Sequence, residues 1–511
     1  MKKKNWSVIK LVSDYIHLLW IIIPSGALML IFVLSCRDEI DPELQAIEIS
    51  EYIRTLNYDP VTLLNVQSIS GELAKEKTAS DATQPSMEDN NLITCTESKY
   101  NLQQNAEQVA IIRPTNGVIW PGALVKINAG LLNGMPEPVT IKAAPVTLRI
   151  DLPNMGEKGT IVVNEPSNSN TSTAIDKSLD WWNNNAYQEG YRNASNSSYA
   201  ASSSFSQEQL AIDLGLNVKW ASGSVSTLFS RTSTKTQKVA MMTFKQVFYT
   251  VTLNTPTQPG IVFDPTVNIE QIKSTFSNAE PPGYIHSVSY GRIIMFRMIT
   301  TESATSVEAE AAIQYGAGKL NTADVNLKTK YQNILQNSTI EVITIGGNAD
   351  TASYATQAKN FGDLAHILTG SNAVYSKSNP GVPIAYTVKF LKDNRVAKMG
   401  YTTNYTANDC TFSTRGLVSV KNHGNYQIKL FIVYDKFDGQ HVYLTPSGIR
   451  PDDSYFHTIP GGSKNIIIHA QTESGSKSIF RIELSGARDC CFVTTGNLTD
   501  FKGYEVDCKN F

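Results

Sequence analysis

Apolar and polar residues alternate with a period of two through one stretch near the middle of the chain, residues 210–220. The apolar positions are Leu210, Ile212, Leu214, Leu216, Val218 and Trp220. Because side chains alternate across a strand, the pattern predicts an 11-residue strand with one apolar and one polar face. This length suits a tilted strand that spans a bilayer, and the terminal Trp suits its interfacial girdle. A half-buried strand that covers a soluble core has the same period and is the alternative.

Similar patterns, rich in β-branched and aromatic residues, indicate a mainly β protein. Strands are expected at 239–253, 285–299, 339–345 and 384–391, and helices near 47–56, 176–185, 304–315 and 359–369. Residues 71–91 are polar and are expected to form a linker or loop. From about residue 401, a run of short strands predicts an independent β-sandwich.

The N-terminus carries the features of an export signal. Lys2 to Lys4 precede an apolar run over 18–34, and VLSC at 33–36 resembles a bacterial lipobox with Cys36 as the lipidated residue. An uncleaved membrane anchor and an ordinary signal cleaved elsewhere are the alternatives. In each case the body of the chain is exported, as an outer-membrane or cell-surface lipoprotein or as a secreted protein.

Composition narrows the classes of function. The chain has 511 residues, enough for three or four domains, and its 41% hydrophobic and 18% charged residues are typical of a globular protein. A formal net charge of −2 leaves no basic excess to neutralise phosphates, so nucleic acid is not expected as a partner. No catalytic constellation stands at a persuasive spacing, so neither an enzyme nor a cofactor is expected.

Six cysteines remain to be placed. Cys36 belongs to the lipobox and Cys95 stands alone, whereas four others cluster near the C-terminus: Cys410, Cys490, Cys491 and Cys508. In an oxidising compartment these four can form one or two disulfides, and the vicinal pair is the least favoured because of strain. A zinc site is the alternative, although no CxxC motif or neighbouring His supports a metal there.

Seven short strings, in order along the chain, carry a resemblance to a known family. They are WPGAL at 120–124, DLPNM at 151–155, KQVFYTV at 245–251, SNAEPP at 277–282 with VSYGR at 288–292, GGNA at 346–349 and FLKDN at 390–394. Each string is weak by itself. Together, over about residues 110–400, they resemble the cholesterol-dependent, or thiol-activated, cytolysins.

The resemblance implies an elongated α+β molecule of four domains. In that family a twisted central antiparallel sheet is flanked by helical clusters, and a thin β linker leads to a C-terminal β-sandwich that meets the membrane. The expected bounds are 1–36 for the signal peptide, 37–92 for an N-terminal linker and helical segment, 93–113 with 383–400 for the thin β linker, 114–382 for the core and pore-forming domains, and 401–511 for the sandwich.

The resemblance also implies that each helical cluster unfolds into a two-strand hairpin, and that many copies pool their hairpins into one membrane-spanning β-barrel. A closed barrel pairs every backbone group, which is what lets a sheet cross lipid. The first hairpin segment is expected near 190–222 and the second near 318–345, where Ile340, Val342 and Thr344 alternate with Glu341, Ile343 and Ile345 in a weaker pattern. Because the family stores these segments as short helices, the strand pattern at 210–220 implies a conformational switch.

Two further motifs are placed by the resemblance. Gly346 and Gly347 stand where the family pivots a strand to free a sheet edge for the next subunit, and glycine permits that change of dihedral angles. A plain turn is the alternative. Tyr290, Gly291 and Arg292 are expected in the core sheet near the pairing edge, with a purely structural role as the alternative.

The C-terminal section departs from the family. The family's Trp-rich undecapeptide is replaced at 471–481 by QTESGSKSIFR, which has neither Cys nor Trp. Membrane-binding loops are expected at Gln471, Thr472, Glu473, Ser474 and Gly475, and at Asn497, Leu498 and Thr499. Trp anchors at the headgroup level and these polar residues do not, so the docking chemistry must differ. Cholesterol dependence cannot be assumed, and a membrane without sterol, a glycan or a protein receptor are all open.

The sequence therefore predicts a cytolysin-like protein that forms homo-oligomers on a target membrane and opens a β-barrel pore. The alternative is a surface-exposed binding lipoprotein that keeps the scaffold and no longer inserts.

Overall fold

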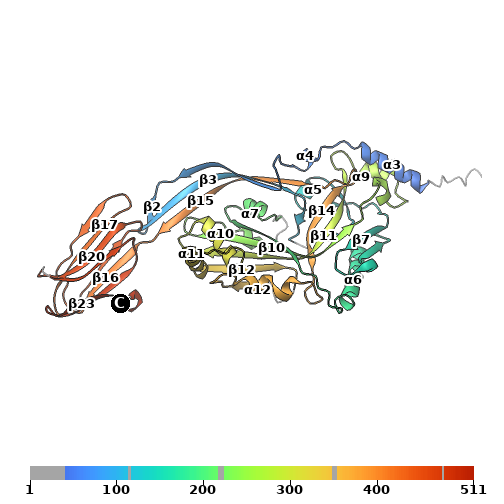
Figure 1. Cartoon of the computed structure of the whole chain (residues 1–511). Coiled ribbons are helices and arrows are strands. Elements are labelled where there is room, and N and C mark those ends of the chain that lie inside the picture. Colours follow the sequence, from blue (N-terminus) through green and yellow to red (C-terminus); the bar gives the residue numbers. More distant parts are fainter. Residues whose placement is uncertain (1–40, 113–116, 217–223, 348–353, 475–476) are drawn as a thin grey trace, which may run out of the picture.

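The computed structural model of the chain is elongated, with a large body, a narrow neck and a β-domain at the far end (Figure 1). It describes residues 41–112, 117–216, 224–347, 354–474 and 477–511. The expected α+β architecture, with a central antiparallel sheet and a C-terminal β-sandwich, is confirmed. Cys36 and the rest of the proposed signal lie outside the described residues.

An 11-stranded sheet forms the body. Its two long strands, β10 (Lys238–Leu253) and β11 (Pro282–Thr300), pair antiparallel along most of their length. β12 (Ser338–Ile345) extends the sheet beyond β11, and short β13 (Tyr354–Thr356) covers the outer edge of β12. The other strands are β4 (Val109–Ala110), β5 (Leu124–Lys126), β6 (Glu137–Pro138), β7 (Val146–Ile150), β8 (Thr160–Val163), β9 (Asn196–Ser203) and β14 (Val382–Phe390).

Alternate residues of the two long strands face different helical layers, because side chains in a strand point to opposite faces. Met242 and Phe296 pack toward α10 (Ser306–Gly316) and α11 (Val325–Gln336). Met241 and Met295 pack toward the layer that holds α7 (Gln207–Asp213) and α8 (Ser224–Phe229). The strands are therefore buried on both faces, and each helical layer is held to the sheet by its own apolar core.

A third core lies at the end of the body away from the neck, around Trp182 of α6 (Asn168–Asn184). The expected helix at 176–185 begins earlier because Ser167 caps it and accepts a hydrogen bond from the Asn170 amide. The expected helix at 359–369 is reduced to α12 (Ala365–Leu368). The other helices are α3 (Pro42–Thr55), α4 (Pro60–Leu63), α5 (Ala129–Leu132) and α9 (Ile269–Thr275), with short 3-10 turns at Gly156–Gly159, Pro259–Val262, Gly370–Ala373 and Cys508–Asn510.

The neck is a separate four-stranded sheet that leaves the body on one side (Figure 1). It consists of β1 (Leu73–Ala82), β2 (Ser86–Glu88), β3 (Asn91–Ala106) and β15 (Met399–Ser413). The expectation of a loop at 71–91 is wrong, because β1 and β2 pair with β3 there. These two strands are exposed almost throughout, so no buried face left an apolar period in the sequence.

The expected domain bounds differ from the structure in four places. β1 and β2, within the expected segment 37–92, belong to the neck sheet, and β4, within 93–113, pairs with β14 in the central sheet. Residues 383–390 were assigned to the thin linker, but β14 pairs with β11 in the central sheet. The boundary set at residue 401 falls inside β15, which continues along the neck to Ser413.

A disulfide joins Cys95 of β3 to Cys410 of β15, where the neck approaches the C-terminal domain. Cys95 was expected to stand alone, and Cys410 to pair within the C-terminal cluster. The two residues are 315 positions apart in sequence and directly opposite each other in the neck sheet, so only the pairing of β3 with β15 brings them together.

Loss of this disulfide is expected to destabilise the chain more than loss of the second disulfide, Cys491–Cys508, which closes a separation of only 17 residues. The entropy that a crosslink removes from the unfolded chain grows with loop length, and the difference amounts to about 2.6 kcal/mol. Denaturant unfolding of Cys410→Ser and Cys508→Ser under oxidising conditions measures it. Equal shifts of the two midpoints would contradict this account.

The C-terminal domain is a sandwich of two four-stranded sheets. Their orders are β19-β16-β22-β23 and β18-β17-β20-β21. The strands are β16 (Gly416–Asn422), β17 (Ile428–Asp435), β18 (His441–Leu444), β19 (Ser454–Ile459), β20 (Lys464–Thr472), β21 (Ser478–Leu484), β22 (Cys490–Gly496) and β23 (Phe501–Val506). Alternating residues such as Ile428, Leu430 and Ile432 fill the space between the sheets.

Candidate functional site

The expected strand at 210–220 begins as a helix. α7 covers Gln207–Asp213, and Ser206 and Gln209 form a capping box at its N-terminus. This local signal satisfies the first free amides of the helix and outweighs the period-two pattern. Leu210, Leu214 and Leu216 are buried against the central sheet, whereas Ile212 packs toward Leu102 of the neck. Val218 and Trp220 lie outside the described residues.

In the structure, the residues expected to form one apolar strand face are therefore divided between the core against the central sheet and the core against the neck. Positions 210 and 214 share one helix face, and position 212 points away from it. Residues 210–213 of the first hairpin segment are thus helical where the sequence has strand periodicity, which is the mismatch expected of a segment with two conformations.

A polar cluster fastens α7 to the neck. The Asp213 carboxylate accepts a hydrogen bond from Ser202 Oγ at 2.6 Å and another from the side-chain amide of Gln209. It also lies 3.8 Å from Lys75 Nζ of β1, and its side chain is only 8% exposed. Separation of α7 from the neck would break this ion pair.

Lys245 of β10 holds the end of the same segment. Its Nζ donates a hydrogen bond to the Gly215 carbonyl at 2.8 Å. Burial lowers the pKa of Lys245 to about 8, and Glu72 acts in the opposite direction. The ammonium group is thus kept in a site that disfavours its charge, beneath the segment that is expected to leave.

The Lys245 pKa predicts a pH dependence of stability. The folded value of about 8 is below the ordinary value of 10.5, so the unfolded chain binds more protons between these values and stability rises with pH. Between pH 8 and 9.5 the expected contribution is about 1.5 kcal/mol. Other groups titrate nearby, so the measurement is the difference in unfolding midpoint between the parent and Lys245→Met across this range. A difference that does not change with pH would contradict the assignment.

A cavity of about 460 Å³ separates α7 from the neck. Ala211 and Leu216 both line it, and each is 7% exposed. The space means that α7 is not packed tightly against the neck along its whole length.

The second hairpin segment is a helix followed by a strand. α11 lies in the layer opposite to α7 and leads into β12. Ile340 and Val342 are buried in the core beneath α10 and α11, whereas Ile343 and Ile345 belong to the core beneath α7. Even and odd positions of this strand therefore face opposite sides of the sheet, as their alternation in the sequence indicates.

The turn after β12 requires glycine. Gly346 and Gly347 have φ angles of 80° and 84°. A Cβ on Gly346 would lie 2.6 Å from the Gly291 carbonyl oxygen, so a side chain there would collide with β11. Residues 348–353 lie outside the description, and the chain returns as β13 on the edge of β12.

The Tyr290–Gly291–Arg292 motif lies inside the sheet and not at its edge, because β10 and β14 pair with β11 on either side of it. Tyr290 stacks on Tyr249 with ring centroids 5.0 Å apart. Arg292 is fully buried, its Nη2 donates to the Ile367 carbonyl at 2.9 Å, and burial lowers its pKa to about 10. These contacts show a structural role, which fixes the α12 region to the sheet.

The loops expected to meet the membrane gather at the end of the sandwich farthest from the neck. β20 runs away from the neck and ends at Thr472, and β22 runs in the same direction and ends at Gly496. Lys477 Nζ lies 3.5 Å from the Leu498 carbonyl oxygen, which brings the two loops side by side.

The chemistry of these loops is polar. Gln471 and Thr472 end β20, the Glu473 carboxylate accepts a hydrogen bond from the Gly448 amide, and the Asn497 side chain accepts from the amide of Thr499. Leu498 is the large apolar residue of this turn and is 55% exposed. Ser474 adjoins the turn, and Gly475 lies outside the described residues.

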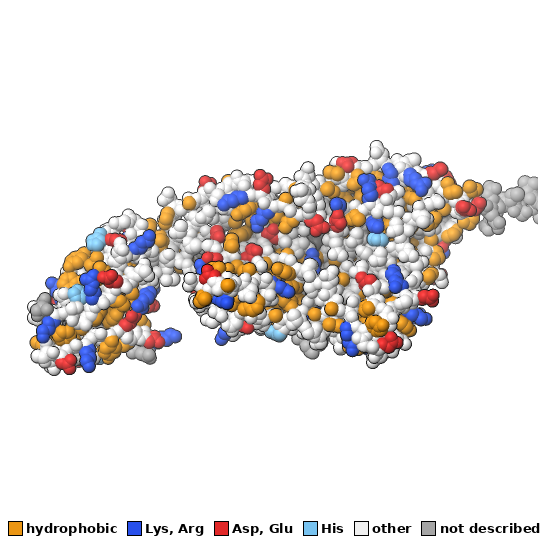
Figure 2. Space-filling view, in the orientation of Figure 1, with side chains coloured by type: hydrophobic (Ala, Val, Ile, Leu, Met, Phe, Trp, Pro, Cys, Tyr) orange, Lys and Arg blue, Asp and Glu red, His pale blue; other side chains and the backbone are white. Residues whose placement is uncertain are grey.

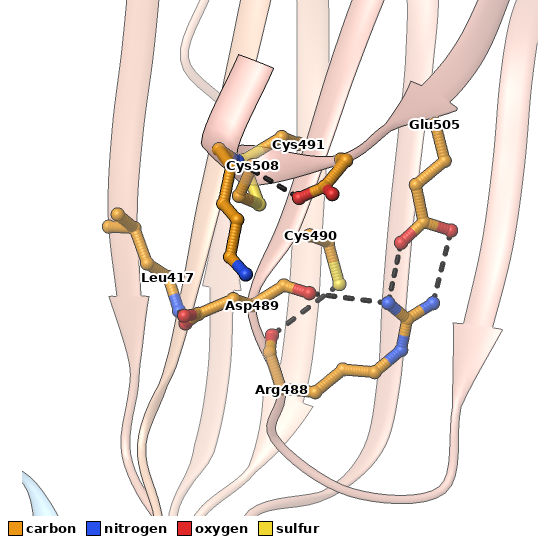
Figure 3. The surroundings of a disulfide bond; sticks show 9 residues. Leu417, Arg488, Asp489, Cys490, Cys491, Glu505 and Cys508 are labelled. Atoms are coloured by element: carbon orange, nitrogen blue, oxygen red, sulfur yellow. Dashed lines mark hydrogen bonds and ion pairs between the residues drawn. A yellow bond between two sulfur atoms is a disulfide. The ribbon is translucent and has the colours of Figure 1, made fainter. Parts of the chain in front are cut away.

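The remaining described cysteines lie at the opposite end of the sandwich, where β22 begins. Cys491 is bonded to Cys508, and its neighbour Cys490 is free and buried (Figure 3). Burial raises the pKa of the Cys490 thiol to about 11, which keeps it protonated at neutral pH. Nearby, Arg488 pairs with both carboxylate oxygens of Glu505. The disulfide therefore braces the base of the domain and not its distal loops.

The family model of thiol-activated cytolysins matches residues 48–412. The chain belongs to the thiol-activated cytolysin family. Streptolysin O of Streptococcus pyogenes is 30% identical over 394 residues, which are 76% of this chain and 66%, just under two thirds, of that protein. Ivanolysin of Listeria ivanovii is 31% identical over 445 residues, 84% of this chain and 81% of that protein.

Solved structures agree with the fold. The crystal structure of wild-type pneumolysin superposes with a TM-score of 0.68, covers 91% of this chain and 99% of that one, and is 23% identical. Membership of the cytolysin family supports the expectation that the chain is not an enzyme.

No helix among the described residues is both long and apolar enough to cross a membrane. Within the same residues, no three His, Cys, Asp or Glu side chains are grouped so that they could hold a metal ion.

Proposed function

We propose that this protein is a pore-forming cytolysin, which oligomerises on a target membrane and inserts β-hairpins into a large β-barrel. The observation that carries the proposal is the first hairpin segment. Its 210–220 sequence has the period and length of a membrane-spanning strand, yet it begins in a capped helix of seven residues. A segment stored in one conformation and used in another is what insertion from a water-soluble form requires.

Assembly needs a free sheet edge, and β12 supplies it once β13 leaves. Among the described residues, three pairs join β13 to β12 and eight join β12 to β11. β13 ends the sheet order next to β12, so it can leave without breaking the pairing of β12 with β11. In the proposal, a change of backbone dihedral angles at Gly346 and Gly347 swings β13 away from the sheet. The freed edge of β12 then pairs with the neighbouring copy of the protein.

Membrane docking is proposed to use the distal loops without a Trp-rich motif. The polar turns around Glu473 and Asn497, with Leu498 as the exposed apolar side chain, suit a headgroup, glycan or protein receptor better than insertion beside sterol. The proposal also includes export, with Cys36 lipidated and the protein held at the outer membrane or cell surface.

The test is electron microscopy and dye leakage on liposomes of varied composition, with and without sterol, and on cells. The account expects high-mass, SDS-resistant rings together with leakage on at least one of these membranes. Binding without rings or leakage on every membrane would favour the second candidate, a surface-exposed binding lipoprotein. The polar distal loops are the observation that favours this candidate.

A further inference from the structure

The N-terminal helix is fastened to the end of the body that lies opposite to the C-terminal domain (Figure 1). Ser50 Oγ of α3 accepts a hydrogen bond from the Gly260 amide at 2.8 Å, and Tyr52 Oη donates to the Phe276 carbonyl at 2.9 Å. The Gln45 amide also donates to the Val267 carbonyl. Ile49 and Ile53 are buried beneath the helix, so α3 is part of the body and not a mobile arm.

The approach of α3 to the Pro259–Val262 turn is unusually close. A Cβ on Gly260 would lie 1.9 Å from the Ala46 carbonyl oxygen, so only glycine allows the contact. This fit fixes the position of α3 against the body.

An apolar patch lies exposed at this same end. Leu44 and Ile47 share one face of α3, three positions apart, and are 63% and 41% exposed. Ile261, directly after Gly260, is 45% exposed. Figure 2 shows hydrophobic surface at the end of the body opposite to the C-terminal domain. We name Leu44, Ile47 and Ile261 the anchor-end patch.

The length of chain before α3 decides what can cover this patch. Only residues 37–40 separate Cys36 from Asp41, where the described chain begins. Five residue steps span at most about 18 Å, even when fully extended. The 16 residues of β3 in the neck alone span about 50 Å.

We propose that the anchor-end patch is the surface that faces the membrane holding the lipidated Cys36, so that the anchored protein directs its C-terminal domain away from that membrane. The inference rests on the proposed lipidation of Cys36. The short tether keeps α3 near the lipid surface, and the patch provides apolar contact there. The distal loops, at the other end of the molecule, cannot reach the same bilayer while the molecule stands on α3. They face an opposing membrane instead.

The charges around α3 define the kind of lipid surface. The helix and its N-cap carry four exposed acidic residues and one basic residue, Arg54. The acidic residues are Asp41, Glu43, Glu48 and Glu51. Such a face is repelled by anionic headgroups, so the patch contributes only when acyl chains on Cys36 hold it near a zwitterionic surface.

The experiment measures the orientation of the lipidated full-length protein in phosphatidylcholine and phosphatidylethanolamine vesicles that carry an acceptor-labelled lipid. A donor dye is attached at Glu48→Cys in α3 or at Leu498→Cys in the distal turn. We expect strong energy transfer to the membrane from position 48 and none above background from position 498. Transfer from position 498 equal to that from position 48 would overturn the inference, because the molecule would then lie flat.

Two controls separate the possible causes of failure. Mass spectrometry of the mature protein tests the acyl modification, and Cys36→Ser should abolish the transfer from position 48. If the protein is acylated and position 498 shows transfer, only the proposed orientation is wrong. If the chain carries no acyl groups, the proposed lipidation and the proposed orientation are both wrong. Neither result bears on pore formation by the secreted form.

The patch itself is tested by the triple variant Leu44→Gln, Ile47→Gln and Ile261→Gln. It should reduce the transfer from position 48. The matched control replaces Val307, Val325 and Leu327, which are exposed on the body at 74%, 71% and 38%, and should leave the transfer unchanged. If Cys36→Ser protein is a dimer in solution and the triple variant makes it a monomer, the patch binds a second copy and the inference is overturned.

Discussion

Leu216→Asp is expected to abolish permeabilisation while leaving membrane binding intact. Position 216 is the seventh of the eleven residues in the two-faced stretch, close to the middle of a spanning strand, and it lies on the apolar face. A carboxylate there would enter the hydrocarbon at a cost of about 2 kcal/mol for each strand. Because many strands close one barrel, the leakage rate should fall by more than about tenfold.

Ala211→Asp is the matched control for this variant. Ala211 and Leu216 line the same cavity beside α7 and are each 7% exposed, so a carboxylate meets similar burial at both positions, although Leu216 also packs against the central sheet. In the released strand they fall on opposite faces, because one has an odd and the other an even position. Leakage close to that of the parent is expected for Ala211→Asp, and also for Leu216→Ala, which removes packing without adding charge. Equal loss in both aspartate variants would contradict the two-faced strand.

A disulfide between β12 and β13, made with Ile340→Cys and Thr356→Cys, should stop assembly. These two residues are paired in the antiparallel register, where opposing Cβ atoms lie close enough to be bridged. The oxidised protein should bind membranes as the parent does, but should form no SDS-resistant oligomers and cause no leakage. Reduction should restore both activities.

The reduced double variant controls for any effect of the substitutions on packing, since Ile340 is fully buried. The parent must be reduced in parallel, because the reductant also opens the native bonds at Cys95–Cys410 and Cys491–Cys508. Oligomers and leakage from the oxidised variant at parental levels would show that β13 does not have to leave β12.

The long strands of the body could be predicted from sequence. β10 and β11 carry apolar residues on both faces over 16 and 19 residues, and the expected ranges fall within one to three residues of the observed ones. Such strands have a strong local signal because both helical layers bury them. The neck strand β1 has no such signal, because nine of its ten residues are exposed.

The stored helix could not be derived from periodicity. The spacing of Leu210, Ile212 and Leu214 favours a strand, and the resemblance to the family was needed to expect a helix. The local evidence was present in Ser206 and Gln209, which form the capping box three residues apart. The eleven-residue alternation outweighed this short capping signal in the prediction. In the proposed mechanism both patterns are correct, because the capping box specifies the helix of the soluble form and the alternation specifies the strand in the membrane.

The Cys95–Cys410 bond was beyond local reasoning for another reason. Nothing near either cysteine in sequence indicates its partner, and their proximity follows only from the register of β3 with β15. The buried role of Arg292 was likewise hidden, because a charged residue within a strand is ordinarily expected at the surface.

The central claim is that the first hairpin segment changes from a helix against the core to a two-faced strand in lipid. Polarity-sensitive dyes attached one at a time to introduced cysteines at positions 207–216 test this most directly, in solution and on permeabilised vesicles. The account predicts that, on the vesicles, the dyes report lipid at even positions and water at odd positions from 210 onward. A helical period on the vesicles, or no change from the soluble protein, would contradict it.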